Sequence, residues 1–179
     1  MAELTAAELG EEVEGSEERI GALCGAKIRG FRSPRSRWSS SLLDILHRRG
    51  YLWNAEGDPS PYPYQVPRGY ARPLVRIPVA VDDWDYVRHR ASPGAVSRLW
   101  RHEVLRAMET GCWVAIGSHP SVLGAHPERM SAFGEFVRWL AAQKVAVLTH
   151  GEAAEWWLAR IRGGGGGSRA ATAGAAEQA

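Results

Sequence analysis

The chain has 179 residues, of which 45% are hydrophobic and 23% charged, with a formal net charge of +2. This length suits one domain with a sizeable core, and the composition is that of an ordinary globular protein. So small a net charge gives no reason to expect nucleic acid or an anionic membrane as a partner. We find no apolar run long enough to span a bilayer and no signal-peptide pattern at the amino terminus.

Charge is unevenly distributed along the first fifty residues. Residues 3–18 hold seven glutamates, whereas residues 27–49 hold seven Lys or Arg and a single Asp. We interpret this pattern as an exposed acidic helix followed by a basic segment.

The two cysteines, Cys24 and Cys112, are far apart in the chain and lie in apolar surroundings. This predicts buried free thiols rather than a disulfide, which fits the reducing cytoplasm.

The first predicted element is an amphipathic helix over residues 5–24, because Thr5 and Glu8 form a capping-box pattern and Gly25 can end the helix. Apolar periodicity, glycine stops and proline positions predict the later elements. The expected apolar face of the first helix is Leu9, Val13, Ile20 and Leu23. Strands are expected at residues 26–31, 51–53, 74–81, 112–116 and 145–148, and helices at 41–49, 97–109, 152–161 and over about fifteen residues from Pro127.

Two segments are expected to lack regular structure. Five prolines fall between Asn54 and Pro73, which predicts a long loop that acts as a lid or rim. A glycine run and an Ala/Gly-rich tail occupy residues 163–179, which we predict to be disordered. The predicted domain is therefore residues 1–162.

The alternation of helices and strands predicts right-handed βαβ units around a parallel sheet or barrel. In such folds the functional residues lie at the carboxyl ends of the strands. Four polar residues fall at predicted strand ends, namely Arg32, Asp82, Asp83 and His119.

His119 is the leading candidate for a general acid or base, because imidazole titrates near neutral pH. Pro120 favours an extended backbone at this histidine. The alternative is a hydrogen-bonded loop histidine without a catalytic role. Arg32 precedes a Ser-Pro pair and could orient a carboxylate through its planar guanidinium, or it could be an ordinary surface arginine.

Asp82, Asp83 and Trp84 could form a polar cleft edge with a face for stacking, although strand-end acids often only cap the following turn. The six histidines show no spacing typical of a metal site. We therefore expect this chain itself to bind no metal or other cofactor.

Several motifs resemble the polysaccharide deacetylase superfamily over about residues 3–160. The segment Gly30-Phe31-Arg32-Ser33-Pro34, with the Leu-rich helix that ends at Gly50-Tyr51, resembles its third conserved block. The strand end His119-Pro120, followed by Gly124, Arg129 and an apolar helix, resembles its last block. Residues 74–79 and Asp82-Asp83-Trp84 lie between them as in the family, while residues 100–103 and 149–156 resemble the branch of peptidoglycan-deacetylase-like and allantoinase-like amide hydrolases.

The resemblance implies part of a distorted (β/α) barrel that hydrolyses an amide, commonly an N-acetyl group on a sugar. It implies a divalent metal, often zinc, held by one aspartate and two histidines, and a second aspartate as general base. Carried over to this chain, His119 protonates the leaving nitrogen and Arg32 holds the base aspartate. Pro34, Asp82, Asp83 and Trp84 are the predicted substrate-binding residues.

The metal-binding and base-containing blocks of that family do not occur in residues 1–179. We therefore expect the carboxyl-terminal part of such a hydrolase, without its first strands and inactive as an isolated chain. The expected ligand is a carbohydrate or a small amide. The alternatives are a glycan-binding module, an allantoinase-like amidase fragment, or a module completed by self-association or by a separate amino-terminal half.

Overall fold

Two small sheets form the framework of the protein, whose computed structural model describes residues 4–66 and 72–163. The larger sheet has the strand order β1-β2-β4-β3, in which β1, β2 and β4 are parallel and β3 is antiparallel to β4. The smaller sheet pairs β5 with β6 in parallel. The strands are β1 (Gly30–Phe31), β2 (Trp53–Gly57), β3 (Tyr64–Gln65), β4 (Val75–Val79), β5 (Val81–Asp82) and β6 (Ile116–Gly117).

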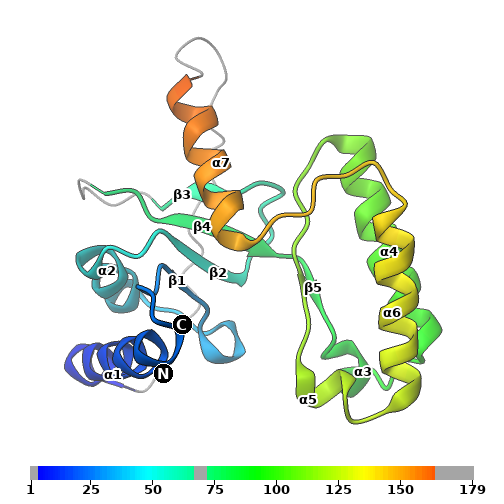
Figure 1. Cartoon of the computed structure of the whole chain (residues 1–179), viewed down its shortest axis with the longest axis horizontal. Coiled ribbons are helices and arrows are strands. Elements are labelled where there is room, and N and C mark those ends of the chain that lie inside the picture. The colour runs from blue at the N-terminus through cyan, green and yellow to red at the C-terminus, as the bar shows by residue number, and fades with distance from the viewer. Residues whose placement is uncertain (1–3, 67–71, 164–179) are drawn as a thin grey trace.

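The two sheets are joined at Ala80, the single residue between β4 and β5. Its backbone N–H donates a 3.1 Å hydrogen bond to the carbonyl of Ala115, just before β6. In Figure 1, β5 accordingly leads from the larger sheet into the part of the molecule that contains α3 to α6. The parallel strands therefore place their carboxyl ends on the same side.

Local sequence signals set the helix ends. Thr5 and Glu8 form the capping box of α1, Ser39 and Ser92 cap α2 and α4, and glycines at positive φ follow all three helices. The helical segments are α1 (Ala6–Cys24), a 3₁₀ turn (Pro34–Ser36), α2 (Ser40–Arg49), α3 (Asp85–Arg88), α4 (Pro93–Thr110), α5 (Pro120–Leu123), α6 (Pro127–Ala141) and α7 (His150–Gly163).

Helices cover both faces of the larger sheet. Leu74 packs with the apolar side chains of α1 and α2, whereas Val75 and Ile77 pack with those of α7. Since successive side chains of a strand point to opposite faces, α7 lies across the sheet from α1 and α2. Figure 1 shows α7 over β2 and β4, with α1 and α2 beside the other end of the sheet.

A separate apolar core joins α4, α5 and α6 to β5 and β6. Trp100 is completely buried there, and its ring contacts Phe133 and Phe136 at centroid distances of 5.9 and 5.3 Å. This core fixes the helices that flank the β5–β6 pair.

The predicted α/β alternation is confirmed, but the structure corrects four details. Residues 145–148 form no strand, and Val147 is 69% exposed, because no described strand pairs with this apolar run. The segment from Asn54 is not wholly irregular: β2 extends to Gly57, ahead of the first proline, and β3 pairs antiparallel at residues 64–65. Residues 67–71 of that predicted loop lie outside the described part.

The other two corrections concern the strand at residues 112–116 and the face of α1. Only Ile116–Gly117 are paired as a strand, because the Trp113 N–H donates instead to the carbonyl of Pro61. On α1, Ile20 and Leu23 are 46% and 87% exposed, and only Leu9 and Val13 are buried.

The acidic α1 and the basic segment after it meet in space. Arg49, the last residue of α2, forms ion pairs with Glu14 and Glu17. Ile20 and Leu23 lie beyond these pairs, which explains why the expected apolar face is buried only in its first half.

Both cysteines are free thiols, but neither is buried: Cys24 is exposed and Cys112 is half-buried. Among the helices of residues 4–66 and 72–163, none has the length and apolar character needed to cross a bilayer. The described strands form two open sheets, so the barrel stays a prediction. The predicted tail lies outside the described residues after Gly163.

Replacing Leu46 by Ala tests whether the apolar cluster between α2 and α1 stabilises the fold. Leu46 is completely buried in the cluster with Leu9 and Val13, so we expect Leu46→Ala to lower the free energy of unfolding by about 2–5 kcal/mol. Chemical denaturation measures this change. Leu23→Ala is the control, since Leu23 is 87% exposed and should change stability by less than about 0.5 kcal/mol. Equal effects of the two changes would contradict the packing described.

Candidate active site

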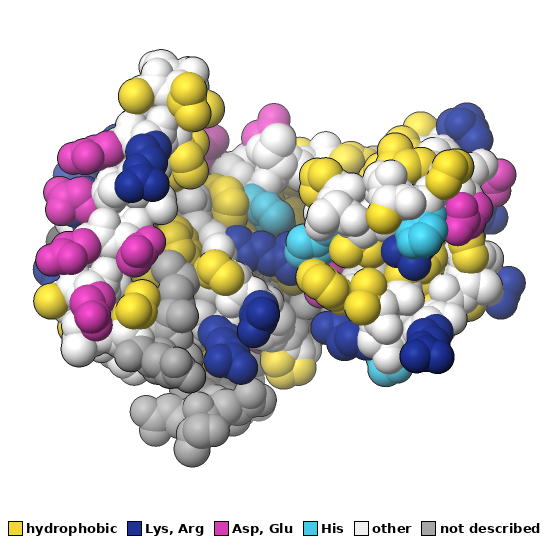
Figure 2. Space-filling model, turned by 90° about the horizontal axis from the view of Figure 1, so that it is seen from below, with side chains coloured by type: hydrophobic (Ala, Val, Ile, Leu, Met, Phe, Trp, Pro, Cys, Tyr) yellow, Lys and Arg dark blue, Asp and Glu magenta, His cyan; other side chains and the backbone are white. Residues whose placement is uncertain are grey.

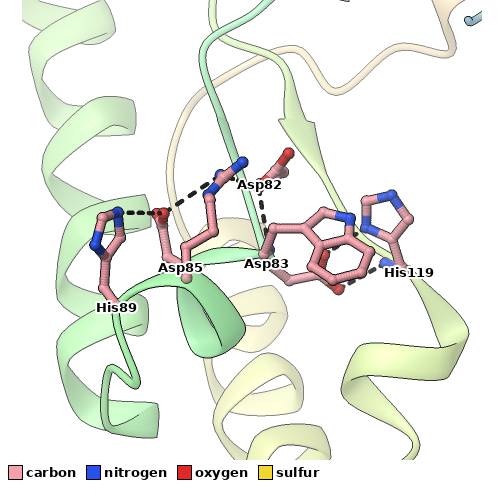
Figure 3. A network of polar contacts seen from close by, with 7 residues as sticks. Asp82, Asp83, Asp85, His89 and His119 are labelled. Carbon is pink, nitrogen blue, oxygen red and sulfur yellow. Dashed lines mark hydrogen bonds and ion pairs between the residues drawn. The ribbon is translucent and has the colours of Figure 1, made fainter. Parts of the chain in front are cut away.

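His119 and Asp83 form a tight pair at the carboxyl ends of β5 and β6. The Nδ1 atom of His119 lies 2.5 Å from Oδ1 of Asp83, and the backbone N–H of His119 donates to Oδ2 at 2.6 Å. The Asp83 side chain is fully buried, whereas the His119 side chain is 33% exposed. Figure 3 shows the carboxylate of Asp83 facing the imidazole of His119, with the dashed contacts between them.

The strand register explains how residues 36 positions apart come together. Asp82 is paired with Gly117, and the Asp83 N–H donates to the carbonyl of Gly117. His119 then adopts an extended backbone with φ −123° and ψ 123°, immediately before Pro120 begins α5. The extended conformation expected from the His-Pro pair is confirmed.

The pair leaves His119 suited to proton transfer. An ionised carboxylate only accepts hydrogen bonds, so we assign a proton to Nδ1, the ring nitrogen that faces Asp83. Nε2 is then the nitrogen available to a ligand. The ring of Trp84, which is 40% exposed, meets His119 edge-on at a centroid distance of 5.6 Å and gives the site an apolar wall.

Asp82 has a different environment from Asp83. Its Oδ1 accepts from the Trp84 N–H at 3.0 Å and from Arg88 Nη2 at 2.8 Å. Asp85 continues this network to Arg88 and His89, as Figure 3 shows. Asp82 thus caps the turn after β5, and substrate binding by Asp82 stays a prediction.

Arg32 follows β1 and reaches across to β6. A methyl group at Gly117 would lie 3.0 and 3.2 Å from Nη1 and Nη2 of Arg32, so the guanidinium rests against this glycine. Within the described part of the chain Arg32 has no hydrogen bond or ion pair. Its charge is therefore available for an anionic partner, beside Gly117, which precedes His119 by two residues in the sequence. Figure 2 shows basic and histidine side chains gathered in the hollow between the two parts of the molecule.

Pro34 is exposed at the start of the 3₁₀ turn that follows Arg32. Arg35 and Ser36 in this turn have left-handed φ values of 58° and 52°, which residues other than glycine adopt only at a cost. Substrate binding by Pro34 stays a prediction.

His150 is a nearby titratable residue that the sequence did not single out. It begins α7, and its ring lies 4.9 Å from that of Trp53, centroid to centroid. Burial, and next the positive charge of Arg32, lower the pKa of His150 below its ordinary value. His150 lies within the motif at residues 149–156, but its surroundings form only when α7 packs on β2, so the sequence did not indicate its place at the site.

The residues of this site do not fit the metal that the resemblance implies. Among residues 4–66 and 72–163, no group of three or more His, Cys, Asp or Glu side chains could hold a metal ion. Both carboxylate oxygens of Asp83 contact His119, and the Nδ1 atom of His119 is occupied by the same pair. Neither Asp83 nor this nitrogen is therefore available as a metal ligand.

Three crystal structures have a fold similar to that of this chain. Two are of proteins assigned as polysaccharide deacetylases, from Mycobacterium smegmatis (TM-score 0.79, 23% identity) and Pseudomonas aeruginosa PAO1 (TM-score 0.77, 19% identity). The third is of PuuE allantoinase (TM-score 0.77, 18% identity). No protein-family model and no curated protein matches the sequence.

These similarities show an α/β fold like that of polysaccharide deacetylases, whereas the barrel that the sequence motifs implied stays a prediction. The matches cover 87–88% of this chain but only 54–58% of the neighbouring chains. The chain therefore spans just over half the length of the structures it resembles.

The pKa of His150 tests the arrangement around Arg32. We expect an NMR titration to give a value below the ordinary 6.5, and Arg32→Gln to raise it partway, because burial remains the larger cause. Since the unfolded state then binds the proton more readily, this histidine destabilises the fold as pH falls through about 6.5. Arg29→Gln is the control, because Arg29 is exposed and paired with Glu155. A His150 pKa insensitive to Arg32→Gln would contradict the arrangement.

Proposed function

We propose that this chain carries the proton-transferring part of a site that hydrolyses carbon–nitrogen amide bonds, as in polysaccharide deacetylases. The observation that carries the proposal is the His119–Asp83 pair: a buried carboxylate aligns a histidine whose outer nitrogen is accessible at the carboxyl ends of parallel strands. The fold shared with two deacetylases and an allantoinase supports the same reaction class.

In this proposal Nε2 of His119 first takes up a proton from solvent and then gives that proton to the nitrogen that leaves when the amide bond breaks. Asp83 keeps the ring in the required tautomer and stabilises its protonated form. Arg32 holds a carboxylate beside the reacting group, because its guanidinium is unpaired within the described residues and presents several parallel donors.

A metal such as zinc would supply polarisation of the amide carbonyl and activation of water. Since the described residues do not fit such a site, the proposal assigns its ligands and the general base to polypeptide outside residues 4–66 and 72–163. The 179-residue chain alone is accordingly proposed to be inactive, and a separate amino-terminal half or self-association would have to complete it.

The proposed substrate is an N-acetylated carbohydrate or, as in an allantoinase-like amidase, a small amide. The exposed ring of Trp84 beside His119 supports the carbohydrate, because aromatic rings in clefts can stack on sugar rings. A cytoplasmic location stays a prediction.

A second candidate function is that of a glycan-binding module without catalysis. Exposed aromatic side chains favour it, since Trp84 lies at the site and Tyr62 is 42% exposed on the loop after β2. Titration with chitin or peptidoglycan oligomers separates the two functions: millimolar ligand that causes neither heat nor a tryptophan fluorescence change excludes the binding module.

An amide hydrolysis assay tests the proposed activity. We expect the purified 179-residue chain with added zinc to hydrolyse neither N-acetylglucosamine oligomers nor allantoin. If the DNA upstream of Met1 encodes, in frame, an Asp-Asp pair and a His-x-x-x-His block, we expect a chain extended to include them to be active.

In the extended chain, His119→Ala should lower kcat by about 10²-fold or more. His102→Ala is the control, because His102 is exposed on α4 and pairs with its neighbour Glu103 rather than with a residue of the site. Turnover by the 179-residue chain that His119→Ala abolishes would overturn the proposed inactivity. Turnover of the extended chain that survives His119→Ala would overturn the role of His119.

A further inference from the structure

A second buried carboxylate, Glu56, lies under the loop that carries Arg32. Its side chain has no solvent exposure, and its Oε1 accepts three hydrogen bonds. Two come from Ser33, from the backbone N–H at 3.0 Å and from the hydroxyl at 2.6 Å. The third comes from Asn54 Nδ2 at 2.8 Å. Burial raises the pKa of Glu56, and the bonds from Ser33 oppose that rise.

A buried arginine holds the other end of the same loop. Arg76 is 1% exposed, and its guanidinium carbon lies 4.4 Å from the centre of the Trp38 ring. Its Nη1 lies 3.5 Å from Oδ2 of Asp58, which also accepts the Tyr64 hydroxyl at 2.6 Å. Register pairs Asn54 with Arg76, so Glu56 and Arg76 project from the same face of neighbouring strands.

Glu56 and Arg76 contact residues on either side of the strained 3₁₀ turn. Ser33 immediately precedes the 3₁₀ turn and Trp38 lies two residues after it, with the left-handed Arg35 and Ser36 between them. Such backbone persists only where the surrounding structure over-determines it. Buried polar groups need partners within the protein, which Ser33 and Asn54 supply to Glu56 and Asp58 supplies to Arg76.

We propose that Glu56 is a positioning residue that, through Ser33, fixes the backbone from which Arg32 reaches Gly117 and the His119 site. Consecutive residues of an extended chain point to opposite sides, so the contact of Ser33 with Glu56 directs Arg32 to the other face. Arg76 secures the far end of the turn through Trp38. The inference rests on the proposed role of Arg32 as the group that holds a carboxylate.

Acetate titration of the ¹⁵N-labelled chain, followed by NMR, tests this inference. We expect acetate to shift the Arg32 Nε–H signal of the natural chain, and Arg32→Gln to abolish binding at that site. Glu56→Gln should move the Arg32 Nε–H and Trp38 indole signals before acetate is added and should weaken acetate binding about fivefold or more.

Glu17→Gln is the matched control, because it removes a carboxylate paired with Arg49 at a distance from the loop and should leave these signals and the acetate affinity unchanged. Should Glu56→Gln fail to fold, Ser33→Ala replaces it, since that change removes only the hydroxyl donor and should move the same signals in the same direction.

Unchanged Arg32 and Trp38 signals together with unchanged acetate affinity in folded Glu56→Gln would overturn the positioning role, even if stability fell. A natural chain that does not bind acetate, or binds it equally after Arg32→Gln, would instead overturn the proposed role of Arg32. The Arg32 and Trp38 signals would then still decide whether Glu56 positions the loop.

Discussion

The carboxylate of Asp83 has no access to water, so its hydrogen bonds must come from the protein. The backbone N–H and the ring of His119 supply them, and both depend on the register that pairs Asp82 with Gly117. Loss of a partner would leave a buried charge uncompensated, which costs several kcal/mol. The position of His119 is therefore tied to the pairing of β5 with β6 and to the core around Trp100 behind them.

Near the carboxyl ends of the parallel strands, a buried carboxylate holds a neighbouring segment by hydrogen bonds in two places. Asp83 aligns a histidine that can move a proton, and Glu56 holds the loop of an arginine that can bind an anion. In each case a fully buried acid contacts the residue, or the loop, that presents a partly exposed candidate side chain. The pattern explains how short strands and irregular loops can present groups in a fixed geometry without metal ligands among the described residues.

Much of this arrangement could be predicted from local sequence. The Thr5–Glu8 capping box, the Arg32-Ser-Pro loop and the His119-Pro120 strand end each depend on neighbouring residues, and the structure has them as expected. Pairing between distant segments was harder to predict. The sequence predicts Asp82 and Asp83 together at a cleft edge, because an alternating strand cannot reveal which of two adjacent acids turns inward towards a histidine 36 residues away.

The failures of prediction have a common physical cause. Residues 145–148 have the composition of a buried strand, but a strand needs a neighbour to take its backbone hydrogen bonds, and the described residues offer none. In the same way, the buried surroundings of His150 form only when α7 packs on β2 beside Trp53, so they cannot be predicted from the residues next to it in the sequence.

The central claim is that Asp83 holds the neutral ring of His119 with its proton on Nδ1, which leaves Nε2 free to exchange a proton with a ligand. ¹⁵N NMR of the His119 side chain tests it most directly, because the two ring nitrogens have different shifts when protonated and unprotonated. We expect a single neutral form with the proton on Nδ1, and a mixture of both forms after Asp83→Asn. A neutral His119 that carries its proton on Nε2 in the natural chain would contradict the account.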